Sequence, residues 1–160
     1  MKVLKFGGTS VGSPARMKAL LDIINPAERQ IVVLSAVSGT TNSLVEIGQA
    51  YLKGDKKRAT DLVAVLKDKY ELFIRELFAT PEFLQQGHEV VQYHFALLAN
   101  IANDLFTTVE DKIILAQGEL LSTTLYHVYL KEIGVPSVLV SALDFMKIDE
   151  DNEPVVDYIT

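Results

Sequence analysis

The sequence contains no cysteine, which excludes disulfide bonds and thiolate metal sites and predicts a reducing, cytoplasmic environment. It has no apolar run long enough to span a bilayer, and it begins with a predicted strand rather than a signal-peptide pattern. Basic residues are few: 15 Lys and Arg stand against 21 Asp and Glu, and the longest basic run covers residues 56–58. The net charge of −6 argues against nucleic acids and membrane surfaces as partners.

The composition that remains is typical of a globular protein. Hydrophobic residues make up 49% of the chain and charged residues 22%, which is not the composition of a disordered segment. A length of 160 residues is enough for about one domain with its own core.

The segment after the first predicted strand, residues 2–6, is suited to bind an anion. It consists of Gly7, Gly8, Thr9 and Ser10. Glycines allow the backbone to approach a ligand closely and allow positive φ angles, and the helix that follows adds unpaired N–H donors. Lys5, at the end of the strand, supplies a positive charge. The pattern predicts a phosphate or carboxylate site with its own cation.

Other interpretations of this segment are open. Residues 7–12 have the glycine spacing of a Walker A loop, but Ser13 and Pro14 stand where Lys and Ser/Thr belong. Residues 8–12 fit the G-x-S-x-G nucleophile elbow with Ser10 as nucleophile, although hydrolases of that type place several strands before it. A glycine-rich turn without a chemical role is the third possibility.

Hydrophobic periodicity predicts an α/β chain with strands at both ends and helices in the middle. The expected strands cover residues 2–6, 30–36 and 136–143, and the second is apolar enough for a sheet covered on both faces. The expected helices run over residues 14–24, from 41 or 42 to 54, from 55 to about 78, from 81 to about 106, and over 109–132 with a break or tightening at 117–118. Residues 149–154 are expected to form a polar loop.

A second loop with polar side chains follows the second predicted strand. It offers the side chains of Ser35, Ser38, Thr40, Thr41 and Asn42. Ligands of open parallel sheets collect at the carboxyl ends of strands, so this loop and residues 7–10 are expected to face one crevice. Simple helix capping is the alternative role for such residues.

Three segments together resemble the aspartokinases, which are members of the amino-acid kinase family. Residues 5–11 are similar to the family's N-terminal signature, and residues 31–42 to its second strand and following loop. Residues 117–123, Gln-Gly-Glu-Leu-Leu-Ser-Thr, resemble its Gly-Glu-Leu-x-Ser element. The resemblance implies a three-layer αβα sandwich with a mainly parallel sheet and several long helices in the N-terminal lobe.

The resemblance also implies a reaction: transfer of the γ-phosphoryl group of ATP, carried with Mg²⁺, to the β-carboxylate of L-aspartate. The product, 4-phospho-L-aspartate, begins the biosynthesis of lysine, threonine and methionine. By position, Lys5 is the residue expected to contact the transferred phosphate, and Gly7, Gly8, Thr9 and Ser10 are expected to bind the phosphates of ATP. No residue is expected to bind a metal directly.

The residues that the resemblance assigns to aspartate are Ser35, Thr41 and Glu119. Glu119 matches a glutamate that binds the α-ammonium group of the substrate, and a partly buried carboxylate in an apolar stretch needs such a cation. Without the resemblance, Glu119 is better explained as a surface carboxylate on the polar face of a helix.

Two elements of the family pattern do not occur in these residues: an arginine–acid segment for the substrate α-carboxylate and a Gly-Gly-Ser-Asp-Tyr segment for ATP. We therefore expect residues 1–160 to be the N-terminal, substrate-side part of a catalytic domain. The nucleotide-binding half and the regulatory domains would be absent, the fragment would be inactive by itself, and the complete enzyme would be a homo-oligomer.

The remaining alternatives make different demands on the chain. A kinase for glutamate or acetylglutamate would keep the glycine turn without the Thr-Ser-Val continuation and residues 118–119. A hydrolase would need a histidine near Ser10, yet the three histidines all fall in segments with helical periodicity. Their spacing is also not that of metal ligands. A helical interaction module without catalytic activity is the last alternative.

Overall fold

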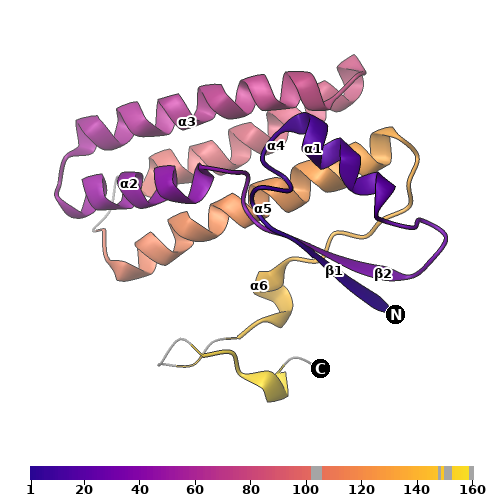
Figure 1. Ribbon diagram of the computed structural model, residues 1–160. Helices are drawn as coiled ribbons and strands as arrows, with labels where there is room; N and C mark the ends of the chain where they lie inside the picture. Colours follow the sequence, from indigo (N-terminus) through magenta and orange to yellow (C-terminus); the bar gives the residue numbers. More distant parts are fainter. Residues whose placement is uncertain (102–105, 148, 150–152, 159–160) are drawn as a thin grey trace.

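The computed structural model describes residues 1–101, 106–147, 149 and 153–158. Within these residues, two strands near the N-terminus are followed mainly by helices (Figure 1). The elements are β1 (Lys2–Phe6), α1 (Pro14–Ala19), η1 (Leu20–Asp22), β2 (Gln30–Leu34), α2 (Thr40–Leu52), α3 (Lys56–Leu77), α4 (Pro81–Asn100), α5 (Thr108–Glu132), α6 (Ala142–Phe145) and η3 (Val156–Tyr158).

Local capping explains where several helices begin. Ser13 precedes Pro14 and Thr80 precedes Pro81, and each hydroxyl accepts a hydrogen bond from the backbone N–H three residues later. The carboxylate of Asp55 does the same at the start of α3. Such caps satisfy N–H groups that have no partner inside the helix. The predicted starts of these three helices are confirmed to within one residue.

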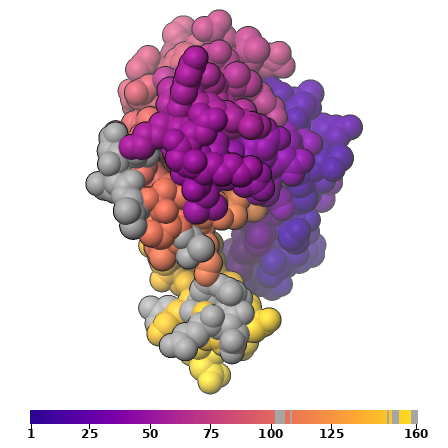
Figure 2. All heavy atoms as spheres, turned by 90° about the vertical axis from the view of Figure 1, so that its left-hand side faces the viewer, coloured from indigo at the N-terminus to yellow at the C-terminus, as the bar shows by residue number. Residues whose placement is uncertain are grey.

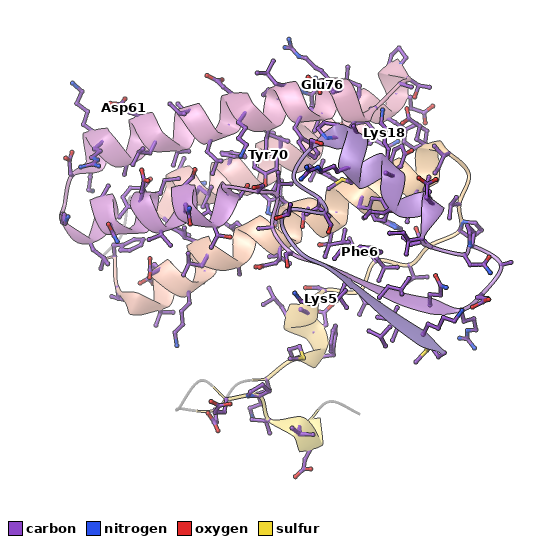
Figure 3. All side chains as sticks on the ribbon, viewed as in Figure 1. Lys5, Phe6, Lys18, Asp61, Tyr70 and Glu76 are labelled. Carbon is purple, nitrogen blue, oxygen red and sulfur yellow. The ribbon has the colours of Figure 1, made fainter. Side chains whose placement is uncertain are left out.

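The four long helices pack side by side around a common core. Helix α3 packs against α2 and α4, and α5 packs against the same two helices. The short helix α1 lies against α3, where Lys18 Nζ donates a hydrogen bond to the backbone oxygen of Glu76 at 2.8 Å (Figure 3). Fully buried side chains at the centre include Leu44, Ile47, Tyr70, Ile74, Leu98 and Leu121.

The strands β1 and β2 are parallel neighbours, with Phe6 opposite Leu34. These two side chains are buried on the face of the sheet that meets the helices. The opposite face carries Val3, Ile31 and Val33, which are 62%, 44% and 42% exposed. The expectation that β2 is covered on both faces is therefore wrong for the described part of the chain, because the helices cover one face only.

The C-terminal part departs most from the sequence prediction. The strand expected over residues 136–143 is not formed: residues 135–141 have no regular structure and α6 begins at Ala142. Val138 in this segment is 86% exposed. A short apolar segment such as Val138-Leu139-Val140 does not by itself supply the hydrogen-bonded neighbour that a strand requires. Figure 2 shows the yellow C-terminal residues standing below the body of helices.

The break predicted at residues 117–118 is also wrong, because α5 continues through them. A methyl group on Gly118 would lie 2.8 Å from Ala36 Cβ and 3.5 Å from Thr40 Cγ2. Glycine therefore stands here because α5 packs closely against the residues that follow β2, at the cost of some helix propensity.

Two further expectations concern segments that the structure describes incompletely. Helix α4 ends at Asn100, and residues 102–105 of the predicted extension lie outside the described residues. Residues 150–152 of the predicted polar loop lie outside them as well. None of the helices in the described ranges combines the length and apolar character needed to cross a bilayer.

Candidate functional site

A hollow of about 360 Å³ lies at the carboxyl ends of the two parallel strands. It is lined by Gly8, Thr9, Ser35, Ala36, Val37, Ser38, Gly39, Thr41, Asn42 and Glu119. Three segments far apart in the sequence therefore meet at the edge of the sheet where ligands of parallel α/β folds bind. Of the predicted site residues, the structure brings together Gly8, Thr9, Ser35, Thr41 and Glu119. Lys5, Gly7 and Ser10 are not among the lining residues.

The turn between β1 and α1 is stabilised by hydrogen bonds among its own residues. The N–H groups of Ser10 and Val11 donate to the backbone oxygen of Gly7 at 2.8 and 3.3 Å. Nη1 of Arg16, in α1, donates to the backbone oxygen of Thr9 at 2.9 Å. The N–H groups of Ser10 and Val11 are therefore engaged within the turn. The residues Thr9 and Ser10 are exposed, so their hydroxyl groups are accessible to a ligand.

Close packing rather than backbone conformation explains the need for glycine at Gly8. Positive φ angles among the described glycines occur at Gly39, Gly54 and Gly134, so the positive φ expected in the turn is not found. A Cβ at Gly8, however, would lie 2.9 Å from the backbone oxygen of Ala36. The absence of a side chain at Gly8 lets the first turn reach the loop that follows β2.

Lys5 lies one residue before the buried Phe6 at the end of β1 (Figure 3). Because side chains alternate along a strand, Lys5 shares the exposed face of the sheet with Val3. It pairs in register with Val33. Lys5 thus remains a predicted catalytic residue, placed on the strand that leads into the turn.

The loop after β2 delivers the start of α2 to the hollow. Gly39, with φ of 80°, is the N-cap residue of α2 and has no side chain to cap the helix. The first turn of α2 therefore meets the hollow with its N–H groups uncapped by a side chain, next to Thr41 and Asn42. Such a helix start, at the positive end of the helix dipole, favours negatively charged groups.

Helix α5 contributes Glu119 and anchors the end of β2. Glu119 is an exposed residue at the edge of the hollow, more accessible to solvent than its apolar sequence neighbours suggested. One turn later, the fully buried Ser122 Oγ donates to the backbone oxygen of Ser35 at 2.7 Å. This bond holds α5 against the end of β2 and keeps Glu119 on the same side as Ser35.

Helix α3 supplies two contacts that the sequence analysis missed. Lys69 Nζ donates to the backbone oxygen of Ser38 at 2.7 Å, and Tyr70 shares a 2.9 Å hydrogen bond with the hydroxyl of Thr40. Burial, with a smaller contribution from the charge of Glu119, raises the pKa of Tyr70 to about 12. One sequence signal was available: Tyr70 falls on the buried stripe of α3, and a buried tyrosine usually needs a partner for its hydroxyl.

Comparison with known proteins gives the family. The sequence model described as "Amino acid kinase family" matches residues 1–159. The chain belongs to the amino acid kinase family.

Aspartokinases are among the proteins that this chain resembles in sequence. The chain is 32% identical to Aspartokinase 1, chloroplastic, of Arabidopsis thaliana, over 94% of this chain and 27% of that protein. It is 36% identical to Aspartokinase 2, chloroplastic, of the same plant, over 82% and 25%. It is 30% identical to Lysine-sensitive aspartokinase 3 of Escherichia coli, over 81% and 28%. The chain thus spans about a quarter of the length of these relatives.

The fold agrees with this assignment. Aspartokinase III of Escherichia coli in complex with aspartate and ADP superposes with a TM-score of 0.79 at 24% identity, over 99% of this chain and 36% of that one. The complex of the same enzyme with lysine and aspartate gives 0.78 at 22% identity. The predicted α/β fold with a parallel sheet is therefore confirmed as that of an amino acid kinase.

The histidines of this amino acid kinase lie elsewhere, which removes support from the hydrolase alternative for Ser10. Each ring Nδ1 has another partner: Gln117 for His94, Glu71 for His88 and Ser137 for His127. A second surface hollow, of about 490 Å³, includes His88 but lies between α3 and α4 and contains no residue of the two strand-end loops. We therefore place the candidate site at the strand ends.

Proposed function

We propose that the complete protein containing this chain is an aspartokinase, and that residues 1–160 form the substrate-side part of its kinase domain. The observation that supports this most strongly is the convergence of Ser35, Thr41 and Glu119 on one hollow. These residues come from a strand end, a helix start and a separate helix 78 or more positions further on. The similarity to named aspartokinases supports the same activity.

The chemistry of the hollow suits an amino acid with two carboxylates. The Glu119 carboxylate is a partner for the α-ammonium group of aspartate. The hydroxyls of Ser35 and Thr41 are donors for carboxylate oxygens, and the start of α2 favours negative charge. The hollow thus offers a negative charge for the ammonium group of aspartate, and hydrogen-bond donors with the positive end of a helix dipole for its carboxylates.

The first turn has the donors for phosphate oxygens. The Thr9 and Ser10 residues are exposed, Gly8 keeps the backbone free of a Cβ, and Lys5 provides an exposed positive charge on the preceding strand. This donor set fits the phosphates of ATP. Mg²⁺, carried with the nucleotide, supplies further positive charge there when it is bound.

The reaction needs alignment more than acid–base chemistry. The β-carboxylate of aspartate is ionised at neutral pH. One of its oxygens forms the new bond to the γ-phosphorus as the bond to the leaving ADP oxygen breaks. The task of the chain is to align that carboxylate and to offset negative charge on the phosphoryl oxygens, the role we assign to Lys5 and the first turn.

We extend the proposal to the setting of the enzyme. The lack of cysteine and of long basic runs supports a reducing compartment such as the cytoplasm, without nucleic acid or membrane partners. We also propose that the complete enzyme is a homo-oligomer, as its family resemblance implies.

An acyl-phosphate trapping assay tests the function. The full-length protein is incubated with ATP, Mg²⁺, hydroxylamine and one amino acid at a time, and aspartyl hydroxamate is expected with L-aspartate. Product with glutamate or acetylglutamate in its place would favour another amino-acid kinase. If no ATP-dependent hydroxamate forms with any of the three amino acids, the proposal is contradicted. Labelling of Ser10 by an organophosphate would favour the hydrolase.

A further inference from the structure

Two consecutive residues of α3, Lys69 and Tyr70, bind the loop that carries the aspartate-facing residues. Lys69 Nζ donates to the backbone oxygen of Ser38 at 2.7 Å. A Cβ at Gly39 would lie 3.4 Å from the same nitrogen, so the ammonium group sits directly beside this glycine. Partial burial of the ammonium lowers the pKa of Lys69.

Tyr70 binds Thr40, the residue that follows Gly39. Its hydroxyl and that of Thr40 are 2.9 Å apart, and both residues are buried, at 1% and 0% exposure. Tyr70 projects from α3 toward the start of α2 in Figure 3. The Thr40 methyl lies 3.5 Å from where a Cβ of Gly118 would stand, so Thr40 is held between α3 and α5.

Residues that make the buried contacts directly precede residues that line the hollow. Thr40 is followed by Thr41, and Gly118 by Glu119; in each pair the first residue is buried and the second lines the hollow. A shift of Thr40 would therefore move Thr41 relative to Glu119. Local hydrogen bonds also act here, from Thr40 N–H to the Val37 backbone oxygen at 2.9 Å and from Ser43 Oγ to the Gly39 backbone oxygen at 3.2 Å. The contacts from α3 add to them at Gly39, which has a positive φ and no capping side chain.

We propose that Lys69 and Tyr70 are positioning residues for L-aspartate: they hold residues 38–40 so that Thr41 and the start of α2 face the substrate opposite Glu119. This rests on the proposed aspartokinase function. Neither side chain lines the hollow, so their effect on substrate passes through the loop. They should govern affinity for aspartate, and hardly affect ATP, whose assigned residues lie in the other turn.

The same helix offers a matched control for Lys69. Lys67 lies two residues earlier and also makes one hydrogen bond, from Nζ to Gln92 Oε1 at 2.8 Å, but its partner is in α4. Replacing either lysine by methionine removes one charge and one hydrogen bond from α3. The two variants differ in whether the lost bond held the substrate loop.

The experiment measures steady-state kinetics of Lys69→Met, Lys67→Met and Lys69→Arg in the full-length protein. We expect Lys69→Met to raise the KM for aspartate about tenfold, with kcat and the KM for ATP changed less than about twofold. Lys69→Arg keeps a donor for the Ser38 oxygen and should restore most of the affinity. Lys67→Met should match the parent protein. Equal KM values for aspartate in the two methionine variants would overturn the proposal.

A second variant protects the test against loss of folding. Tyr70→Phe keeps the buried ring and removes only the hydroxyl, and we expect it to raise the KM for aspartate about fivefold. If Lys69→Met does not fold, Tyr70→Phe and Lys69→Arg decide: parent-like KM in Tyr70→Phe would overturn the proposal.

The proposed function and this inference fail in different ways. If the parent protein makes no aspartyl phosphate, the function itself is wrong and the inference falls with it. If the parent is active and all α3 variants bind aspartate as it does, only the inference is wrong. A change confined to thermal stability, with unchanged KM, would likewise assign Lys69 and Tyr70 a purely structural role.

Discussion

The two loops at the carboxyl ends of β1 and β2 are built in different ways. The β1–α1 turn is held by hydrogen bonds between residues close in sequence, such as Ser10 to Gly7 and Arg16 to Thr9. The loop after β2 has a local bond of this kind, from Thr40 N–H to the Val37 backbone oxygen, but other helices hold it as well. Lys69, Tyr70 and Ser122 are each 30 or more positions away from the residue they contact in it. The hydrogen bonds of the first turn are mainly local, whereas the loop after β2 also depends on the packing of the helices.

The difference matches the tasks we assign to them. Phosphate groups recur in the same form in every ATP molecule, and the glycines and hydroxyls of one short turn, with the lysine before it, offer donors suited to them. A particular amino acid requires groups from several directions at fixed separations. Contacts from α3 and α5 provide that by holding Ser35, Thr41 and Glu119 in one place.

The largest expected effect tests the chemical role of the first turn. Lys5→Ala in the full-length protein should lower kcat at least a hundredfold, because removing one preorganised charge-stabilising donor costs roughly 2.7–4 kcal/mol of barrier. Lys2→Ala is the matched control, since Lys2 is an exposed lysine on the same strand that pairs with Glu28 at 2.8 Å. Its kcat should not change. Near-normal kcat in Lys5→Ala would remove Lys5 from the mechanism.

The next effect tests how the two loops meet. Gly8→Ala places a methyl group 2.9 Å from the Ala36 backbone oxygen and should lower the free energy of unfolding by about 2–3 kcal/mol. Gly7→Ala is the control, because a Cβ there has no atom within 4 Å and the φ angle is not positive. Its stability should change by less than about 0.5 kcal/mol. Urea denaturation measures both, and equal effects would show that the close approach at Gly8 is unimportant.

The smallest effect compares a long-range anchor with a local cap. Ser122→Ala removes the hydroxyl that donates to the Ser35 backbone oxygen and should lower the free energy of unfolding by about 1–2 kcal/mol. Ser13→Ala removes the cap of α1 and should cost about 1 kcal/mol. The energies are similar, so NMR chemical shifts make the distinction. Changes should reach residues 35–41 in Ser122→Ala and stay near α1 in Ser13→Ala. The opposite pattern would contradict the division into a local and a long-range loop.

Much of the fold and of the candidate site was predictable from local features. Ser13-Pro14, Asp55 and Thr80-Pro81 marked helix starts that the structure confirms, because capping depends on a few consecutive residues. The residues expected to meet at the strand ends do so in large part, because parallel strands place their following loops at one edge.

The failed predictions share a cause. The composition of residues 136–143 predicted a strand, but no paired strand forms there in the described residues. Gly118 predicted a break in the helix, but close packing against Ala36 explains the glycine and α5 continues through it. The same holds for β2, whose apolar side chains Ile31 and Val33 are exposed on one face. Composition shows what a segment tolerates, while its partners determine what it forms.

The amino-acid sequence by itself determined the strand–glycine turn–helix at the N-terminus, the starts of the helices and the residues that mark the family. These depend on side chains and backbone within a few positions, so they can be recognised along the chain. Only the tertiary structure decided that Gly8 must pass close to Ala36 and that Lys69 and Tyr70 hold the loop before Thr41. Contacts between residues 28 or more positions apart arise from packing, and no local pattern encodes them.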